Sequence, residues 1–120
     1  MQGLGDLEAL VMDELWSTDE PQSVHDLVAR LERHKSLAYT TVLTVVTHLH
    51  DKGWVSRQKR GRAYFYTATE SRAAATARAV RELLDSSADP AAVLLHFART
   101  ATARESDILR RGLSGESDQP

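Results

Sequence analysis

The hydrophobic pattern of the chain changes its period within residues 38–68. Apolar residues recur three and four positions apart up to Lys52, whereas Trp54–Lys59 and Arg62–Ala68 are rich in β-forming residues that alternate with polar ones. Gly53 separates the two patterns, and glycine readily adopts the left-handed conformation that ends many helices. A helix followed directly by a hairpin is therefore the strongest constraint on the fold.

Two further helices are predicted before this region. Apolar residues at helical spacing mark Asp6–Trp16, where Asp6 is the expected N-cap, and residues 24–31, which Ser23 is expected to cap. The hairpin that follows the third helix turns at Arg60-Gly61. Three helices followed by a hairpin predict a winged helix-turn-helix.

Alanine and arginine become frequent after the hairpin, and three short helices are predicted there. They cover Ser71–Leu84, residues 90–98 and residues 103–113, with start signals at Asp89-Pro90 and Thr102. Helices this short bury little surface alone, so their apolar stripes are expected to pack against a second copy of the chain. The expected dimerisation residues are Ala73, Ala77, Val80, Leu84, Leu94, Leu95, Ile108, Leu109 and Leu113.

The predicted fold class is mainly α with one small β-hairpin (α+β). The expected domains are a winged helix-turn-helix DNA-binding domain over residues 1–69 and a helical dimerisation domain over residues 70–113. Residues 114–120 are expected to form a flexible tail. A domain of about 60–70 residues is marginally stable alone, and dimerisation would help it.

Basic residues are concentrated in the middle of the chain, although the net charge is −2. Residues 1–32 hold eight acids and one base, a charge of −7, and residues 33–66 hold seven bases and one acid, a charge of +6. Residues 67–120 hold seven bases and eight acids. A basic block alone is also typical of an ordinary solvated face, so the motifs inside it must decide its function.

The third helix carries an unusual outer face. Its apolar residues Val42, Val45, Val46 and Leu49 share one face, which is expected to pack on the first two helices. The opposite face is rich in threonine, a poor helix former whose short side chain suits a major groove: the hydroxyl bonds phosphates or base edges, and the methyl contacts thymine. We interpret this helix as a recognition helix for double-stranded operator DNA; a solvated helix of unusual composition is the alternative. Its expected DNA-binding residues are Tyr39, Thr40, Thr41, Leu43, Thr44, Thr47 and His48.

For Leu43, two interpretations have equal weight: a contact with a thymine methyl, or packing at the edge of the helix.

Basic residues cluster around the hairpin turn, where they can neutralise DNA phosphates. This hairpin, residues 54–68, is the wing of the predicted winged helix. Its expected DNA contacts are Arg57, Lys59, Arg60 and Arg62. On the returning strand, core packing rather than base stacking is predicted for some of Tyr64, Phe65 and Tyr66.

No pattern for catalysis or metal binding is present in the sequence. There is no cysteine, and His48 and His50, two positions apart on a helix, point about 200° from each other. The other histidines are scattered, and no zinc-protease, phosphate-loop or serine-elbow motif occurs. We expect no enzyme activity, metal or cofactor. Because no apolar run approaches the ~20 residues of a membrane span and no secretion signal is visible, a cytoplasmic protein without membrane insertion is expected.

Several stretches of the chain resemble the penicillinase repressor family, the BlaI/MecI repressors. The stretches are Gly5–Glu8, Val11–Trp16, Ala38–Val45, His48–Val55 and Arg60–Tyr66. The resemblance implies a homodimeric transcriptional repressor, held together by its C-terminal helices, that binds palindromic operators. It also implies that the third helix enters the major groove and the wing touches the DNA backbone.

Many members of this family control β-lactam resistance genes. They are inactivated when a membrane sensor metallopeptidase triggers cleavage of an Asn-Phe bond in the C-terminal domain. The matching position here is His96-Phe97, without the asparagine. Members often carry basic residues where this chain has Leu43, His48 and Asp51, so readout of guanine by arginine is less available. Copper-responsive members use C-terminal cysteines, and this chain has none.

Two other functions are compatible with the predicted fold. A winged helix can serve as a protein–protein interaction module, for which the acidic residues 1–32 are suited, although the +6 block argues against a neutral partner. A DNA-binding regulator that senses a small ligand near the dimer interface is the second, and no residue pattern marks such a pocket.

Overall fold

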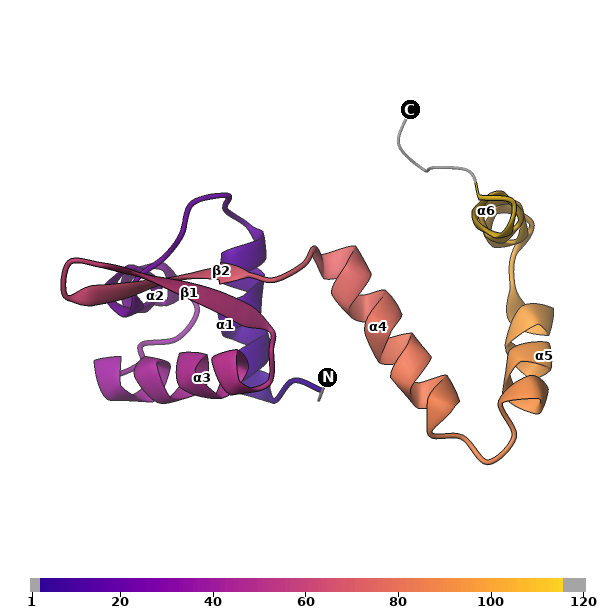
Figure 1. Cartoon of the computed structure of the whole chain (residues 1–120), viewed down its shortest axis with the longest axis horizontal. Helices are drawn as coiled ribbons and strands as arrows, with labels where there is room; N and C mark the ends of the chain where they lie inside the picture. The colour runs from indigo at the N-terminus through magenta and orange to yellow at the C-terminus, as the bar shows by residue number, and fades with distance from the viewer. Residues whose placement is uncertain (1–2, 116–120) are drawn as a thin grey trace. The chain divides into compact units, whose positions relative to one another are not determined.

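The computed structural model describes residues 3–115, so residues 116–120 of the predicted tail lie outside it. The elements run in the order α1 (Asp6–Trp16), α2 (Val24–Leu31), α3 (Tyr39–Asp51), β1 (Val55–Arg60), β2 (Ala63–Ala68), α4 (Arg72–Asp85), α5 (Pro90–Thr100) and α6 (Ala103–Leu113) (Figure 1). Mainly α structure with one antiparallel hairpin is the class predicted from the sequence.

The first compact unit, which runs to Val80, packs α1, α2 and α3 around one apolar core. The face of α3 predicted to be internal is buried, and the base of the hairpin closes the core. The buried apolar residues of this core are Val11, Met12, Leu15, Val24, Leu27, Leu31, Val42, Val45, Val46, Leu49, Trp54, Val55, Tyr66 and Ala75.

The first turns of α4 belong to this unit. Ala75 is buried in the core, and the Arg72 guanidinium lies 2.6 Å from a carboxylate oxygen of Asp13 on α1. The compact units divide after Val80, inside α4. A small alanine allows the helix to approach the core closely.

Local signals place most element ends as predicted. Gly53 and Gly61 have φ of +83° and +63°, so the end of α3 and the hairpin turn use the conformation that glycine tolerates best. Ser23 caps α2 by accepting a hydrogen bond from the Asp26 N–H. The predicted N-cap of α1 is wrong by one residue: Gly5, not Asp6, precedes the helix. The Gly5 carbonyl already accepts the first helical hydrogen bond, from the Ala9 N–H at 2.9 Å.

The base of the hairpin is held by more hydrogen bonds than its tip. Lys59 pairs with Tyr64 and Arg57 with Tyr66 in the antiparallel register. At the base, Gln22 exchanges two backbone hydrogen bonds with Tyr66, of 3.0 and 2.8 Å, on the second edge of β2. The base is thus held on both edges, whereas the tip near Gly61 is held by β1–β2 pairing.

The second unit, described over residues 81–115, comprises the end of α4 with α5 and α6. Its predicted start signals are confirmed: Asp89 caps α5, and Thr102 and Glu105 form a capping box on α6. Within these residues Leu84 alone is buried, and large apolar side chains are exposed along all three helices. None of the helices in the described part of the chain is long and apolar enough to cross a membrane.

Candidate DNA interface

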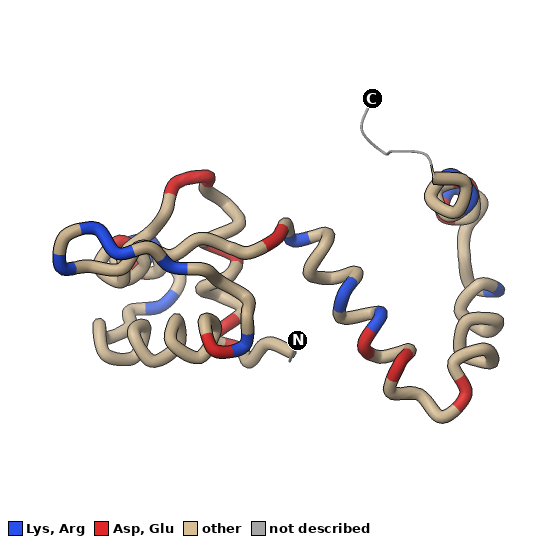
Figure 2. Tube along the Cα trace, in the orientation of Figure 1, with Lys and Arg blue, Asp and Glu red and all other residues tan. Residues whose placement is uncertain are grey.

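The outward face of α3 is exposed and rich in hydroxyl groups, and its one acid, Asp51, stands at the last position of the helix. Tyr39, Leu43 and His48 are exposed with Thr40 and Thr44, whereas Thr41 and Thr47 are half-buried. From Tyr39 to His50 the helix carries no Lys, Arg, Asp or Glu, as the tan tube of α3 shows (Figure 2). A surface helix without formal charges can approach another surface closely.

The threonine hydroxyls of α3 bond to the helix itself. The Thr44 hydroxyl donates to the Thr40 carbonyl at 3.0 Å, and the Thr47 hydroxyl donates to the Leu43 carbonyl at 2.8 Å. Each hydroxyl oxygen keeps acceptor capacity after this donation. Bonds within the helix therefore hold the threonine side chains of this outward face in one arrangement.

The N-terminus of α3 differs from that of α2. Ala38 stands at its N-cap position and makes no side-chain cap, and its first turn holds no acidic residue. By contrast, Ser23 and Asp26 form a complete capping box on α2. The amide groups of the first turn of α3 thus lack the side-chain acceptors that those of α2 have.

An aromatic pair joins α2 to the start of α3. The rings of His25 and Tyr39 lie 4.6 Å apart at an interplanar angle of 41°, and both residues are exposed. This contact fixes the direction of Tyr39 from a second helix. The role of His25 was not predictable from the sequence, because nothing in the spacing of a histidine on one helix indicates a ring on the next.

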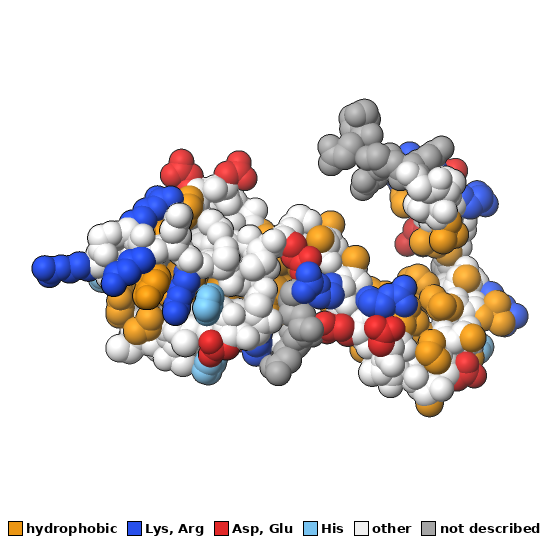
Figure 3. Space-filling view, in the orientation of Figure 1, with side chains coloured by type: hydrophobic (Ala, Val, Ile, Leu, Met, Phe, Trp, Pro, Cys, Tyr) orange, Lys and Arg blue, Asp and Glu red, His pale blue; other side chains and the backbone are white. Residues whose placement is uncertain are grey.

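The wing is a cationic surface that also contains aromatic rings. Its four basic residues are exposed, and within residues 3–115 none of them forms an ion pair with an acid. The Arg57 guanidinium lies 4.3 Å from the centre of the Tyr64 ring, and that of Arg60 lies 5.1 Å from the centre of the Phe65 ring. Figure 3 shows blue and orange side chains together at this end of the first unit.

The prediction that some of the three wing aromatics are core is confirmed for one of them. Tyr66 is 1% exposed at the base of the hairpin, whereas Tyr64 is 41% exposed near the tip. The alternation of the strand places both rings on one face. That face changes from buried to exposed along the hairpin, which periodicity alone does not reveal.

Two cations of the basic block are paired inside the winged helix. Arg33 joins Arg30 and His34 around the buried carboxylate of Glu14, at distances of 3.1–3.5 Å. The Lys52 ammonium lies 2.7 Å from a carboxylate oxygen of Glu8. The block thus supplies internal ion pairs as well as the unpaired wing.

Glu8 responds to these surroundings. Burial raises the pKa of the Glu8 carboxyl, but the Gly5 N–H, the Lys52 ammonium and the nearby His48 together lower it further, so that the pKa lies below the ordinary value of 4.5. The charged carboxylate therefore ties the start of α1 to the end of α3.

Residues 4–112 match the sequence profile of the family described as Penicillinase repressor. The chain belongs to the penicillinase repressor family. It is 40% identical over 114 residues to "Transcriptional regulator BlaI" from two Mycobacterium tuberculosis strains, CDC 1551 / Oshkosh and H37Rv, covering 92% of this chain and 83% of each relative. The family assignment suggested by the sequence motifs is confirmed.

The fold of this penicillinase repressor also matches a solved structure. The solution structure of the DNA binding domain of the repressor BlaI aligns with a TM-score of 0.53 at 23% identity, covering 60% of this chain and 90% of that one. The likeness confirms the predicted winged helix in the first unit.

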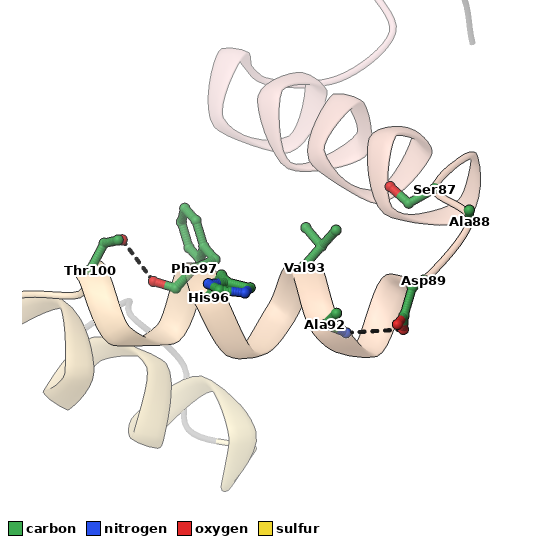
Figure 4. Close-up of a pocket in the computed structure, with 8 residues that line it drawn as sticks. All are labelled: Ser87, Ala88, Asp89, Ala92, Val93, His96, Phe97 and Thr100. Carbon is green, nitrogen blue, oxygen red and sulfur yellow. Dashed lines mark hydrogen bonds between the residues drawn. The ribbon is translucent and has the colours of Figure 1, made fainter.

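The C-terminal residues predicted from the sequence of this penicillinase repressor lie mostly on the surface. Of the nine expected dimerisation residues, Leu84 is buried, at 8% exposed, and the rest are exposed. His96 and Phe97 lie within α5, where they line an open, largely apolar hollow with the turn after α4 (Figure 4). Within residues 3–115, no three His, Asp or Glu side chains are grouped so as to hold a metal ion.

Proposed function

We propose that this repressor binds palindromic operators as a homodimer, with α3 of each copy in the major groove and each wing on the DNA backbone. As a penicillinase repressor, the chain is a DNA-binding transcriptional repressor and not an enzyme. In the proposed arrangement, residues 1–69 bind DNA, residues 70–113 hold the dimer together, and the protein acts in the cytoplasm.

The observation that carries this proposal is that the exposed cations lie on the wing, whereas the exposed hydroxyl and apolar groups lie on α3. From Tyr39 to His50, α3 presents threonines, Tyr39 and Leu43 without a lysine, arginine or acid, whereas the neighbouring wing presents unpaired cations. Phosphate contacts position a protein on DNA without reading sequence, and close contacts to base edges read it. The two surfaces match these two tasks.

The contacts within α3 support specific roles in the groove. Thr44 and Thr47 retain acceptor oxygens for base amino groups, and Leu43, 39% exposed, offers an apolar contact for a thymine methyl. The first-turn amides beside Tyr39, without a side-chain cap, are oriented to bind a phosphate.

The exposed apolar residues of the second unit support the homodimer. Isolated surface leucines are common, but here they recur along three consecutive helices that have one buried residue within residues 81–115. A second copy of the same helices would cover them by a symmetric contact.

The proposal also includes regulation by proteolysis. The family resemblance assigns inactivating cleavage, triggered by a membrane sensor metallopeptidase of β-lactam response systems, to the His96-Phe97 position. This bond lies inside α5, so the helix has to unwind before a peptidase can bind it. Mass spectrometry after coexpression with such a peptidase tests this step; an intact chain would remove it from the proposal.

A mobility-shift titration against the promoter of its own operon tests the central claim. We expect a salt-sensitive complex at micromolar protein that resists competitor DNA. Changing Arg60 and Arg62 together to alanine should weaken binding to all DNA and lower the salt slope, by about one for each phosphate that the wing no longer neutralises. Thr44→Ala should instead change the preference between the operator and random DNA.

The two variants control for each other because both alter exposed positions. If they reduce binding to operator and random DNA in the same proportion, the assignment of α3 to reading and of the wing to the backbone is wrong. If the unmodified chain produces no competitor-resistant shift, sequence-specific repression through this promoter is excluded.

A further inference from the structure

We propose that Tyr64 is a positioning residue of the wing, which holds Arg57 and Lys59 in place for DNA phosphates. The inference rests on the proposed function and adds a residue that does not itself carry the charge. Its basis is the exposed ring of Tyr64 and the two cations that lie over it.

The hairpin register brings the three side chains onto one face. Lys59 stands directly opposite Tyr64, and Arg57 stands diagonally to it, opposite Tyr66. Diagonal neighbours across an antiparallel pair are within reach of long and aromatic side chains. The Arg57 guanidinium lies 4.3 Å and the Lys59 ammonium 6.0 Å from the centre of the Tyr64 ring. One ring therefore serves two cations.

The support for the hairpin explains why a ring is needed at this place. At the base, Gln22 and the core hold Tyr66 and Val55, and the structure around them is fixed by burial. Arg57, Lys59 and Tyr64 lie further out, where all three are exposed. Long basic side chains lose rotamer freedom when they bind a phosphate, at a cost that rises with the freedom they had before. A ring that restrains them in advance lowers that cost.

The other face of the hairpin provides an internal comparison. Arg60 stands diagonally to Phe65 and lies 5.1 Å from the centre of its ring. This pair holds one cation, and the Phe65 ring is half-buried, so its substitution also disturbs packing. Tyr64 holds two cations and is more exposed, which makes its effect on the cations separable from its effect on the fold.

The test measures the affinity of the full chain for a fluorescent duplex of random sequence, about 30 base pairs or three helical turns long, over a range of salt concentrations. Binding to random DNA isolates the contribution of phosphate contacts to the affinity. We expect Tyr64→Leu to weaken binding about three- to fivefold for each wing, the effect of removing an exposed cation–π interaction. The salt slope should stay the same, because no charge is removed. Arg57→Ala should weaken binding and lower the slope.

Three variants separate positioning from the alternatives. Tyr64→Phe keeps the ring and should bind like the unmodified chain; a loss equal to that of Tyr64→Leu would mean that the hydroxyl binds DNA directly and would overturn the proposal. In a chain that already carries Arg57→Ala and Lys59→Ala, Tyr64→Leu should have no further effect. An undiminished loss in that background would also overturn it, as would a fall in thermal stability large enough to account for weaker binding.

Failure of this inference differs from failure of the proposed function. If the unmodified chain binds DNA and Tyr64→Leu binds equally well, only the role of Tyr64 is refuted. If the unmodified chain does not bind either the random duplex or its own promoter, the proposed function fails, and the role of Tyr64 fails with it.

Discussion

The two compact units of the chain contain similar helices but bury very different amounts of apolar surface. Residues up to Val80 enclose a core in which Leu27, Val46 and Tyr66 are almost fully buried. Residues 81–115 leave most of their large apolar side chains exposed, Leu113 at 87% and Phe97 at 63%. Burial of apolar surface is the main favourable term in folding, so we expect the first unit to fold alone and the second to need a further apolar surface.

Helical spacing and helix caps do not explain this difference. Both units have apolar stripes at helical spacing and capped helix starts. The first unit adds a hairpin and the start of α4, which together close its core. A second copy of the chain would do for the second unit what the hairpin does for the first.

The largest effect is expected from a charge in the exposed apolar surface of the second unit. Leu109→Arg should abolish the dimer, because an unpaired charge would be buried at the contact. Affinity for a palindromic operator should fall about a hundredfold or more, since two linked half-site contacts become one. Sedimentation and DNA titration measure the two effects, and Arg104→Ala on the same helix is the control. A Leu109→Arg protein that stays dimeric would place the dimer contact elsewhere.

The next effect compares two leucines, one in each unit. Leu27→Ala should lower the free energy of unfolding of the winged helix by about 2–5 kcal/mol, because it leaves a cavity in a closed core. Leu94→Ala should lower stability only through the dimer, so its effect should change with protein concentration. Chemical denaturation at two protein concentrations checks both. If neither substitution has an effect that changes with protein concentration, the second unit is stable by itself.

A smaller effect is expected at the ion pair between α1 and α3. The pKa of Glu8 is lowered on folding, so its charged form stabilises the fold above pH 4.5, and this contribution is lost as the pH falls below 4.5 through the folded value. Glu8→Gln should destabilise the first unit by about 1 kcal/mol near neutral pH and by less in acid. Thermal melts across this pH range measure it, with Asp6→Asn as the matched control. A constant difference between Glu8→Gln and the unmodified chain would contradict the assignment.

Effects of similar size are expected from the helix caps. Ser23→Ala and Thr102→Ala each remove the side-chain acceptor of a capping box, at a cost of about 1 kcal/mol. The contrast between the units predicts that only the Thr102→Ala loss depends on protein concentration. The same dependence in both variants would show that the two units unfold together.

Much of the fold follows from local sequence signals. The period change at Gly53, the turn at Gly61 and the capping boxes determine element order and most ends, because each acts over a few residues. The burial of Ala75 was not predictable in this way. It depends on where α4 meets the core, and an alanine stripe has the same appearance whether it packs within the chain or against a partner.

In the candidate site, too, features within one element could be predicted from the sequence, but contacts between elements could not. The exposed face of α3 and the basic wing could be predicted because periodicity and charge are read along one element. The His25–Tyr39 pair joins two helices, and the cations over Tyr64 join two strands in a particular register. Side-chain contacts of this kind require the relative position of the elements, which the spacing of residues does not contain.

The hydroxyl bonds along α3 have a consequence for the base edges that this helix would meet in the proposed major-groove position. Thr44 and Thr47 use their donor hydrogens on carbonyls one turn back, so the face they present consists of acceptors and methyl groups. An acceptor atom on a base edge, such as O6 of guanine, N7 of either purine or O4 of thymine, would have to compete with the helix for those hydrogens. Amino groups of adenine and cytosine and the methyl group of thymine meet no such competition. If α3 occupies the major groove as proposed, these bonds within the helix would favour donor groups and methyl groups on the base edges over acceptor atoms.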